Sequence, residues 1–169
     1  MGAQYEGDGR FYKAELYYKK YDRLALVEKG TVDAAEVLTS GGYGYSKGFD
    51  LFFNDRVLLK NLEYQLSYTY NIAKRKFQEY TELTTPQYAT QHNASLVLKY
   101  SIPRIGTIVG LTNRFSSGRP YHNPDLLGLM NDHVKPYNSL DLGLTFLPSK
   151  KVIIHASATN ILCRKNEFG

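Results

Sequence analysis

The fold of this chain is decided by residues 62–73, which read LEYQLSYTYNIA. Apolar and polar residues alternate through this stretch, so a β-strand would separate them onto its two faces, whereas a helix would mix them. The apolar face would carry Tyr64, Leu66, Tyr68, Tyr70 and Ile72, and the polar face Gln65, Ser67, Thr69 and Asn71. The stretch therefore predicts a strand with one apolar face and one polar face.

The same alternation recurs along the chain and predicts six further strands. In one of them Asn113 interrupts the apolar face, and in another the neighbours Ile153 and Ile154 blur the alternation. The predicted ranges are 12–19, 43–54, 93–100, 107–116, 139–147 and 152–159.

The connections between these strands alternate between long and short. An outer-membrane barrel has this pattern, because its periplasmic turns are tight and its outer loops are extended. A strand of about 10 residues, rising ~3.4 Å per residue and tilted by about 40°, spans about 26 Å, close to the roughly 25 Å apolar band of such barrels. The sequence therefore predicts an all-β, antiparallel, up-and-down transmembrane β-barrel segment of about seven strands. The long connections, expected at the outer surface, are 22–41, 74–92 and 117–137, and the short periplasmic ones are 55–61, 102–105 and 148–151.

Aromatic residues gather toward the ends of the predicted strands, as in the two interfacial girdles of a membrane barrel. The alternative is a soluble or surface-exposed β-sandwich that binds a ligand, because aromatic residues also form strands well and pack cores. The polar faces do not decide between the two, since they would meet water in either. The alternation of loop lengths favours the barrel. The aromatic residues are Tyr12, Tyr18, Tyr43, Tyr45, Tyr64, Tyr70, Tyr100, Phe115 and Phe146.

Composition excludes several other classes of protein. A chain of 169 residues is expected to form one domain. It has no apolar run of the roughly 18 to 20 residues that a membrane-spanning helix needs, and an aromatic content of 14% excludes a disordered chain. The net charge is +5, but the basic runs at 74–76 and 150–151 adjoin turn or loop signals. We therefore expect these runs to be solvated flanks and expect no nucleic-acid partner.

Three stretches carry a resemblance to a known family: GYSKGFDLFF at 44–53, SGRPYHNP at 117–124 and TNILCRKNEFG at 159–169. They resemble the C-terminal part of the barrel of TonB-dependent outer-membrane receptors, of the Bacteroidetes type, and the resemblance covers essentially the whole chain. It implies a barrel of about 22 strands with an N-terminal plug. It also implies energised import of a siderophore, corrinoid, glycan or similar nutrient, with the outer-membrane lipid, the plug domain and the TonB energy-coupling complex as partners.

The chain departs from the pattern of that family in several ways. It contains no plug, no TonB box and no closing strand with a terminal aromatic residue, and seven is an odd number of strands for a single-chain bacterial barrel. We therefore expect residues 1–169 to be a partial barrel domain, truncated at both ends. The N-terminus, Met1 to Tyr5, does not read as a signal peptide, so the expected location is the outer membrane as part of a longer parent protein.

Enzymatic chemistry is not expected of this sequence. Cys163 and His155 have no apparent partner that would orient them as nucleophile and base. His122 and His133 share a predicted loop with two aspartates, but the spacing matches no recognised zinc or iron site. We predict no catalytic residue, no metal and no cofactor.

The candidates for ligand contact are five residues expected near the outer mouth of the barrel: Arg114, Arg119, Tyr121, Asn123 and Asn71. Each also has a structural alternative. Gly118, Arg119 and Pro120 would shape the loop through the backbone preferences of glycine and proline. Arg114 would pair with a carboxylate of a neighbouring strand, such as Asp141.

Overall fold

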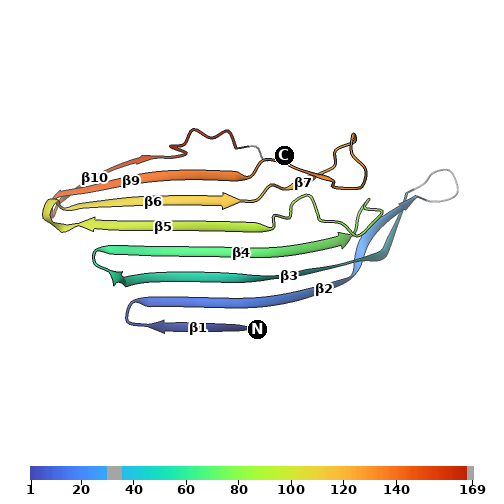
Figure 1. The fold of residues 1–169 in the computed structure, drawn as a ribbon, viewed down its shortest axis with the longest axis horizontal. Helices are drawn as coiled ribbons and strands as arrows, with labels where there is room; N and C mark the ends of the chain where they lie inside the picture. The colour runs from blue at the N-terminus through green and yellow to red at the C-terminus, as the bar shows by residue number, and fades with distance from the viewer. Residues whose placement is uncertain (30–35, 167–169) are drawn as a thin grey trace.

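A computed structural model describes residues 1–29 and 36–166 and shows one large antiparallel sheet (Figure 1). The eight strands of this sheet follow one another in the order β1-β2-β3-β4-β5-β6-β9-β10. They are β1 (Gly2–Gly7), β2 (Arg10–Lys29), β3 (Glu36–Leu59), β4 (Leu62–Lys76), β5 (His92–Ile102), β6 (Thr107–Ser116), β9 (Tyr137–Ser149) and β10 (Val152–Ala158). A short pair, β7 (Pro120–Tyr121) and β8 (Asp132–His133), and the 3-10 turn η1 (Pro103–Ile105) complete the described elements. None of the described helical residues forms a segment that is long and apolar enough to cross a membrane.

Short connections gather at one end of the sheet and long ones at the other (Figure 1). At the turn end, residues 8–9, 60–61 and 150–151 and the turn η1 join neighbouring strands. Asp8 and Gly9 both have positive φ, 50° and 76°, as a two-residue hairpin turn that follows the twist of its strands requires. At the loop end, residues 77–91 join β4 to β5 and residues 117–136 join β6 to β9. The predicted antiparallel, up-and-down fold and the alternation of these connections are confirmed.

The structure differs from the prediction at three places, of which the third is the short connection 55–61: β3 continues to Leu59, so only residues 60–61 join it to β4. The sheet has eight strands, because the N-terminal stretch pairs with β2 as strand β1. The predicted long connection 22–41 is mostly strand: β2 continues to Lys29 and β3 begins at Glu36, while residues 30–35 lie outside the described residues. Register shifts between Asp22 and Leu24 and between Leu24 and Leu26 explain the second difference, because a bulge breaks the alternation by which a strand is recognised.

The two faces of the sheet have opposite character. The cross-strand pairs place Leu16, Phe49, Leu98 and Leu142 on one side, called here the apolar face. The polar face carries the alternate residues, among them Glu15, Asp50, Ser67, Ser95, Thr112 and Asp141.

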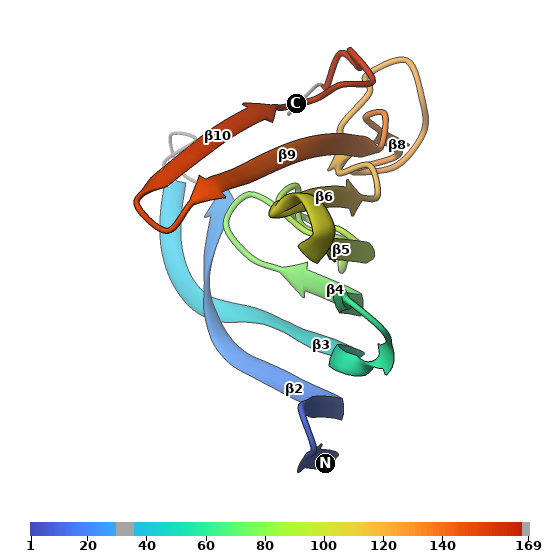
Figure 2. The ribbon, with the colours of Figure 1, turned by 90° about the vertical axis from the view of Figure 1, so that its left-hand side faces the viewer.

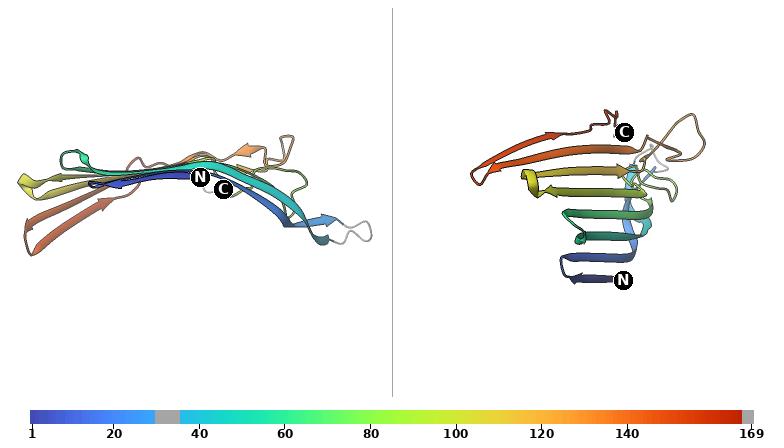
Figure 3. Two further views of the ribbon diagram at one scale, coloured as in Figure 1. Left: turned by 90° about the horizontal axis from the view of Figure 1, so that it is seen from below. Right: turned by 60° about the vertical axis from the view of Figure 1, so that its left-hand side comes forward.

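No second layer covers the apolar face among the described residues. Figures 2 and 3 show the sheet as one curved and twisted layer. Leu16 is 61% exposed and Tyr18 is 66% exposed, and apart from the loop prolines Pro86 and Pro120 the buried apolar side chains of the described part are Leu26, Ala73 and Ala89. A sandwich would bury the apolar face against another sheet. The alternative of a soluble sandwich is therefore wrong for this part of the chain.

On the apolar face, the apolar residues of neighbouring strands form a continuous band, called here the apolar strip, which crosses the sheet obliquely. One row of paired residues runs through Arg10, Asp55, Tyr64, Leu98, Leu111, Leu142 and Ala158. In β2 the apolar residues of this face, Tyr12 to Tyr18, are centred five residues to the loop side of that row. In β10 they are Ile154 to Ala158, and their centre, Ala156, lies two residues to the turn side of the row. The strip therefore shifts by seven residues over six strand-to-strand steps, which is a slope of about 40° at ~3.4 Å per residue and ~4.8 Å per strand.

Candidate functional site

The polar face carries a hydrogen-bonded group of side chains in the middle of β2 and β3 and toward the loop end of β4. The Oδ1 atom of Asn71 accepts hydrogen bonds from the hydroxyls of Tyr17, at 3.1 Å, and Ser46, at 2.7 Å. Beside them Thr69 donates to Asp50 at 2.7 Å. These five residues line a hollow of about 510 Å³ in the polar face. Asn71, predicted as a ligand contact, thus lies in a concave polar surface with hydroxyl, amide and carboxylate groups.

Arg114 on β6 pairs with Asp141 on β9. Its Nη1 atom donates to Oδ2 of Asp141 at 2.8 Å, and the other carboxylate oxygen accepts from Ser139 and from the backbone N–H of Asn160. The predicted structural alternative for Arg114 is therefore confirmed. The guanidinium side chain is still 55% exposed, against 16% for Asp141. Arg114 can thus contact a solute on the polar face while Asp141 holds it in place.

The loop between β6 and β9 is folded around Asp132. The Asp132 Oδ2 atom accepts from the Tyr121 hydroxyl at 2.6 Å and from the Asn123 side-chain amide at 3.0 Å. These bonds hold the pKa of Asp132 below its usual value and raise the pKa of Tyr121. Asn131 closes the other side of the loop, because its amide donates to the carbonyls of Asn123, Leu126 and Gly128. Tyr121 and Asn123 therefore meet at one carboxylate and shape the loop.

Arg119 lies in the same loop but contributes its backbone alone. Its carbonyl accepts from the N–H of Val134 at 3.0 Å, and its side chain is exposed without a partner among the described residues. Pro120 next to it is buried, and a Cβ on Gly118 would lie 1.9 Å from the Val134 carbonyl oxygen. The segment thus has the predicted shaping role, and it presents one free guanidinium to solvent.

Sequence reasoning missed a clamp at the loop end, formed by Arg75, Tyr21 and Tyr88. The Arg75 guanidinium lies 4.3 Å from the ring centre of Tyr21 and 5.6 Å from that of Tyr88, and it donates to the Tyr88 hydroxyl at 2.5 Å. The expectation that the basic run 74–76 is merely a solvated flank is therefore wrong for Arg75. The two tyrosines come from β2 and from loop 77–91, and nothing in the linear spacing indicated that they meet.

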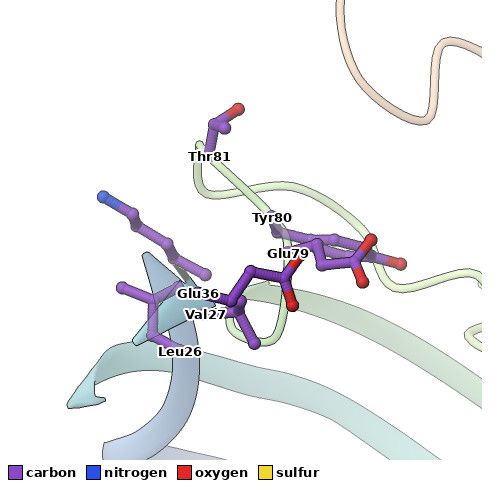
Figure 4. Close-up of a pocket in the computed structure, with 7 residues that line it drawn as sticks. Leu26, Val27, Glu36, Glu79, Tyr80 and Thr81 are labelled. Atoms are coloured by element: carbon purple, nitrogen blue, oxygen red, sulfur yellow. The ribbon is translucent and has the colours of Figure 1, made fainter. Parts of the chain in front are cut away.

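The same loop, residues 77–91, is fastened to both of its neighbours. Gln78 exchanges backbone hydrogen bonds with Ala25 and Val27 of β2, at 2.7 and 2.8 Å. Toward the other side, Thr84 donates to the Leu129 carbonyl and Glu82 accepts from the Leu129 N–H. Between this loop and the β2–β3 hairpin lies a pocket of about 670 Å³ (Figure 4), lined by Leu26, Val27, Glu36, Lys76, Glu79, Tyr80 and Thr81.

The five predicted contact residues therefore fall into separate groups. Arg119, Tyr121 and Asn123 share loop 117–136, and Arg114 lies on the polar face of the strand that leads into it. Asn71 lies on β4, two strands away from Arg114, which corresponds to about 10 Å between their strands. In the described part of the chain, no group of three or more His, Cys, Asp or Glu residues is placed to hold a metal ion.

Comparison with known proteins bears on the fold. No protein-family model matches the sequence, and no curated protein is detectably similar to it. Among solved structures, the FrpB iron transporter from Neisseria meningitidis (F3-3 variant) is similar with a TM-score of 0.72 and 13% identity, over 96% of this chain and 26% of the transporter. The outer membrane transporter YddB from Escherichia coli is similar with a TM-score of 0.66 and 13% identity, over 95% of this chain and 28% of that protein. The chain thus spans little more than a quarter of either transporter, and its sheet has the fold of an outer-membrane β-barrel transporter.

Proposed function

We propose that this chain is a section of the wall of an outer-membrane, TonB-dependent receptor that imports a nutrient. The observation that carries the proposal is the oblique apolar strip. Strands of a membrane barrel are tilted by about 35–45°, so a flat lipid layer must cross them at that angle. The slope of the strip in this sheet, about 40° from the register and standard strand dimensions, has that value. A soluble sheet has no reason to shift its apolar residues steadily from strand to strand.

The aromatic residues fit the same tilt. With strands inclined by about 40°, Tyr12, Tyr64, Tyr100 and Phe146 fall about 8 Å to the turn side of the centre line of the strip, and Tyr18, Tyr70 and Phe115 about 8 Å to its loop side. Phe49, Phe53 and Tyr68 lie between these levels. The backbones of these two levels are about 16 Å apart and lie toward the two edges of the roughly 25 Å apolar band, which is flanked by the aromatic girdles of a barrel.

In this proposal the turn end faces the periplasm and the loop end faces outward, because outer-membrane barrels carry their long loops outside. The polar face lines the aqueous passage. The imported substrate, a siderophore, corrinoid, glycan or similar compound, contacts Asn71 in its hollow, Arg114 above Asp141, and Arg119, Tyr121 and Asn123 in the outer loop. A plug domain and the TonB complex, which the family resemblance implies, would gate the passage and supply energy.

The wall is tested by cysteine accessibility in cells that express the full-length protein, after Cys163→Ser removes the native thiol. We expect cysteines at Ser67, Ser95 and Thr112 to react with a small water-soluble thiol reagent. Cysteines at Leu66, Leu96 and Leu111 should resist it and react with a lipid-soluble reagent instead. Equal reaction of both sets with the water-soluble reagent would contradict the proposal.

Import is tested with a panel of iron–siderophore complexes, cobalamin and oligosaccharides. Cells that express the protein should accumulate at least one of these compounds, and a protonophore should abolish the accumulation. Arg119→Ala should raise the half-saturating concentration of that compound, whereas Lys150→Ala at the turn end should leave it unchanged. Absence of uptake for the whole panel, or uptake that ignores the protonophore, would overturn the assignment.

A further inference from the structure

Three exposed lysines lie together on the apolar face toward the loop end of the sheet. The register places Lys20, Tyr45 and Lys74 side by side on β2, β3 and β4, and places Tyr18, Lys47 and Ile72 side by side in the next row. All three lysines are exposed. Lys20, Lys47 and Lys74, called here the lysine patch, therefore surround Tyr45 on the face that continues into the apolar strip.

The patch has an excess of positive charge. Lys20 pairs with Asp22 at 3.2 Å, and Lys47 lies 5.8 Å from the ring centre of Tyr45. No partner of the Lys74 side chain is present among the described residues. Three lysines and the one aspartate leave a formal charge of +2. An anion of complementary charge can therefore be accommodated without displacing a buried group.

Charge on this face is confined to the margins of the strip. In the described strands, the charges at the turn-side margin are Arg10 and Asp55, which pair with each other at 3.3 Å. At the opposite margin the lysines of the patch are not matched in this way. With strands tilted by about 40°, the lysine backbones stand roughly 10–19 Å to the loop side of the centre line of the strip. The hydrocarbon layer extends about 15 Å from its centre, so the lysine backbones straddle its edge and their long side chains can carry the ammonium groups to the level of the lipid headgroups.

We propose that the lysine patch binds the phosphate group of an acyl lipid in the outer leaflet of the membrane; this inference rests on the proposed function. The lysine stems extend along the apolar surface while their ammonium groups reach the phosphate. Below them Leu16, Tyr18 and Phe49 offer exposed or half-exposed apolar surface for the acyl chains. This juxtaposition of ammonium groups and apolar surface on one face favours a phosphorylated lipid over a free anion, which would make no use of the strip.

The test measures lipid binding to the full-length protein in neutral detergent by native mass spectrometry. The probe is a diphosphorylated acyl-glucosamine lipid, compared with the same lipid after removal of its phosphates and with inorganic phosphate. The variant Lys20→Gln, Lys47→Gln, Lys74→Gln should lose about 100-fold in affinity for the phosphorylated lipid, since each lysine near an anionic membrane surface is worth roughly 5-fold. The control Lys60→Gln, Lys150→Gln, Lys151→Gln removes the same charge from the turn end and should bind as the unmodified protein does.

Two outcomes would overturn the inference. One is equal affinity of the patch variant and the turn-end control; the other is full competition by inorganic phosphate, which would indicate a site for a free anion. If the patch variant fails to fold, the inference is tested instead by the salt dependence of lipid binding to the unmodified protein. A plot of the logarithm of the binding constant against the logarithm of the salt concentration with a slope close to zero would contradict a phosphate site. The cysteine-accessibility experiment on Leu66, Leu96 and Leu111 is independent of the patch, so it separates failure of this inference from failure of the proposed wall function.

Discussion

Gly48 shows how a single residue shapes the hollow around Asn71. It pairs with Asn71 across β3 and β4, and a Cβ at this position would lie 1.9 Å from the Tyr70 carbonyl oxygen and 2.8 Å from the Tyr17 hydroxyl. Absence of a side chain thus allows β3 and β4 to stay paired and lets Tyr17 reach Asn71. The alternation in residues 43–54 placed Gly48 on the polar face, but only the cross-strand register reveals what its missing side chain makes room for.

Gly48→Ala should destabilise the folded protein. Steric overlap with a backbone atom costs about 1–3 kcal/mol, and the hydrogen bond from Tyr17 to Asn71 should be lost. The urea midpoint of the protein refolded in detergent measures the change. Gly143→Ala is the matched control, because the nearest atom to its Cβ would be 3.9 Å away; an equal loss of stability in both variants would refute the steric explanation.

Arg114 and the residues of loop 117–136 differ in how far their contacts could be predicted from the sequence. Its pairing with Asp141 was predictable, because both residues fall on the polar faces of strands expected to be close. The contact of Tyr121 and Asn123 with Asp132 was not, because it depends on the path of loop 117–136. Side chains on regular strands can be placed from period-two alternation, whereas loop side chains are placed by contacts between residues that no periodicity connects.

At the scale of elements, the β2–β3 hairpin and loop 77–91 form one assembly at the loop end. Leu26 of the hairpin is 4% exposed, and Gln78 pairs with the backbone on either side of it. The sequence predicted a long connection here, and the bulges in β2 are the reason that the strands were missed. The alternation of connection lengths was recognisable because 77–91 and 117–136 are irregular throughout most of their length.

Arg75→Gln should loosen loop 77–91. The substitution removes the contacts with the rings of Tyr21 and Tyr88, which are worth about 0.5–2 kcal/mol together with the hydrogen bond to Tyr88. Hydrogen exchange at the amides of Gln78 and Thr84 should accelerate by roughly 10-fold. Lys74→Gln, a neighbour of the same charge outside the clamp, should leave these rates unchanged. Unaltered exchange in the Arg75 variant would show that the backbone bonds alone hold the loop.

The stability of loop 117–136, which contains β7 and β8, should fall at acid pH. The folded pKa of Asp132 is lowered, so its carboxylate stabilises the loop fully above its unfolded pKa of about 3.9. That stabilisation is lost as the pH falls through the still lower folded pKa. Proteolysis of loop 117–136 by an acid-active protease should therefore accelerate below about pH 4. Asp132→Asn should already show fast cleavage at pH 6 by a protease that is active at that pH; slow cleavage of that variant would contradict the role given to the carboxylate.

At the scale of the whole molecule, the sheet is organised by the oblique apolar strip. Alternation within strands was readable in the sequence, and so was the fold class. The slope was not, because it depends on which residues of neighbouring strands are paired, and a shift of register by two residues preserves the alternation while changing the slope. Alternation alone is compatible with any sheet that has one apolar and one polar face. The register adds the slope of the apolar strip, and that slope is the one expected for tilted strands in a lipid layer.

Depth in the bilayer tests this claim most directly. Single cysteines at Ala14, Leu62 and Ala156, in the Cys163→Ser background, would carry a nitroxide label whose distance from the bilayer centre is measured in the full-length protein. Leu62 and Ala156 belong to one paired row, four strand steps apart. At a tilt of about 40° we predict Ala156 and Ala14 within about 3 Å of the bilayer centre and Leu62 about 12 Å away from it. Equal depths for Leu62 and Ala156, or labels that contact no lipid, would contradict the account.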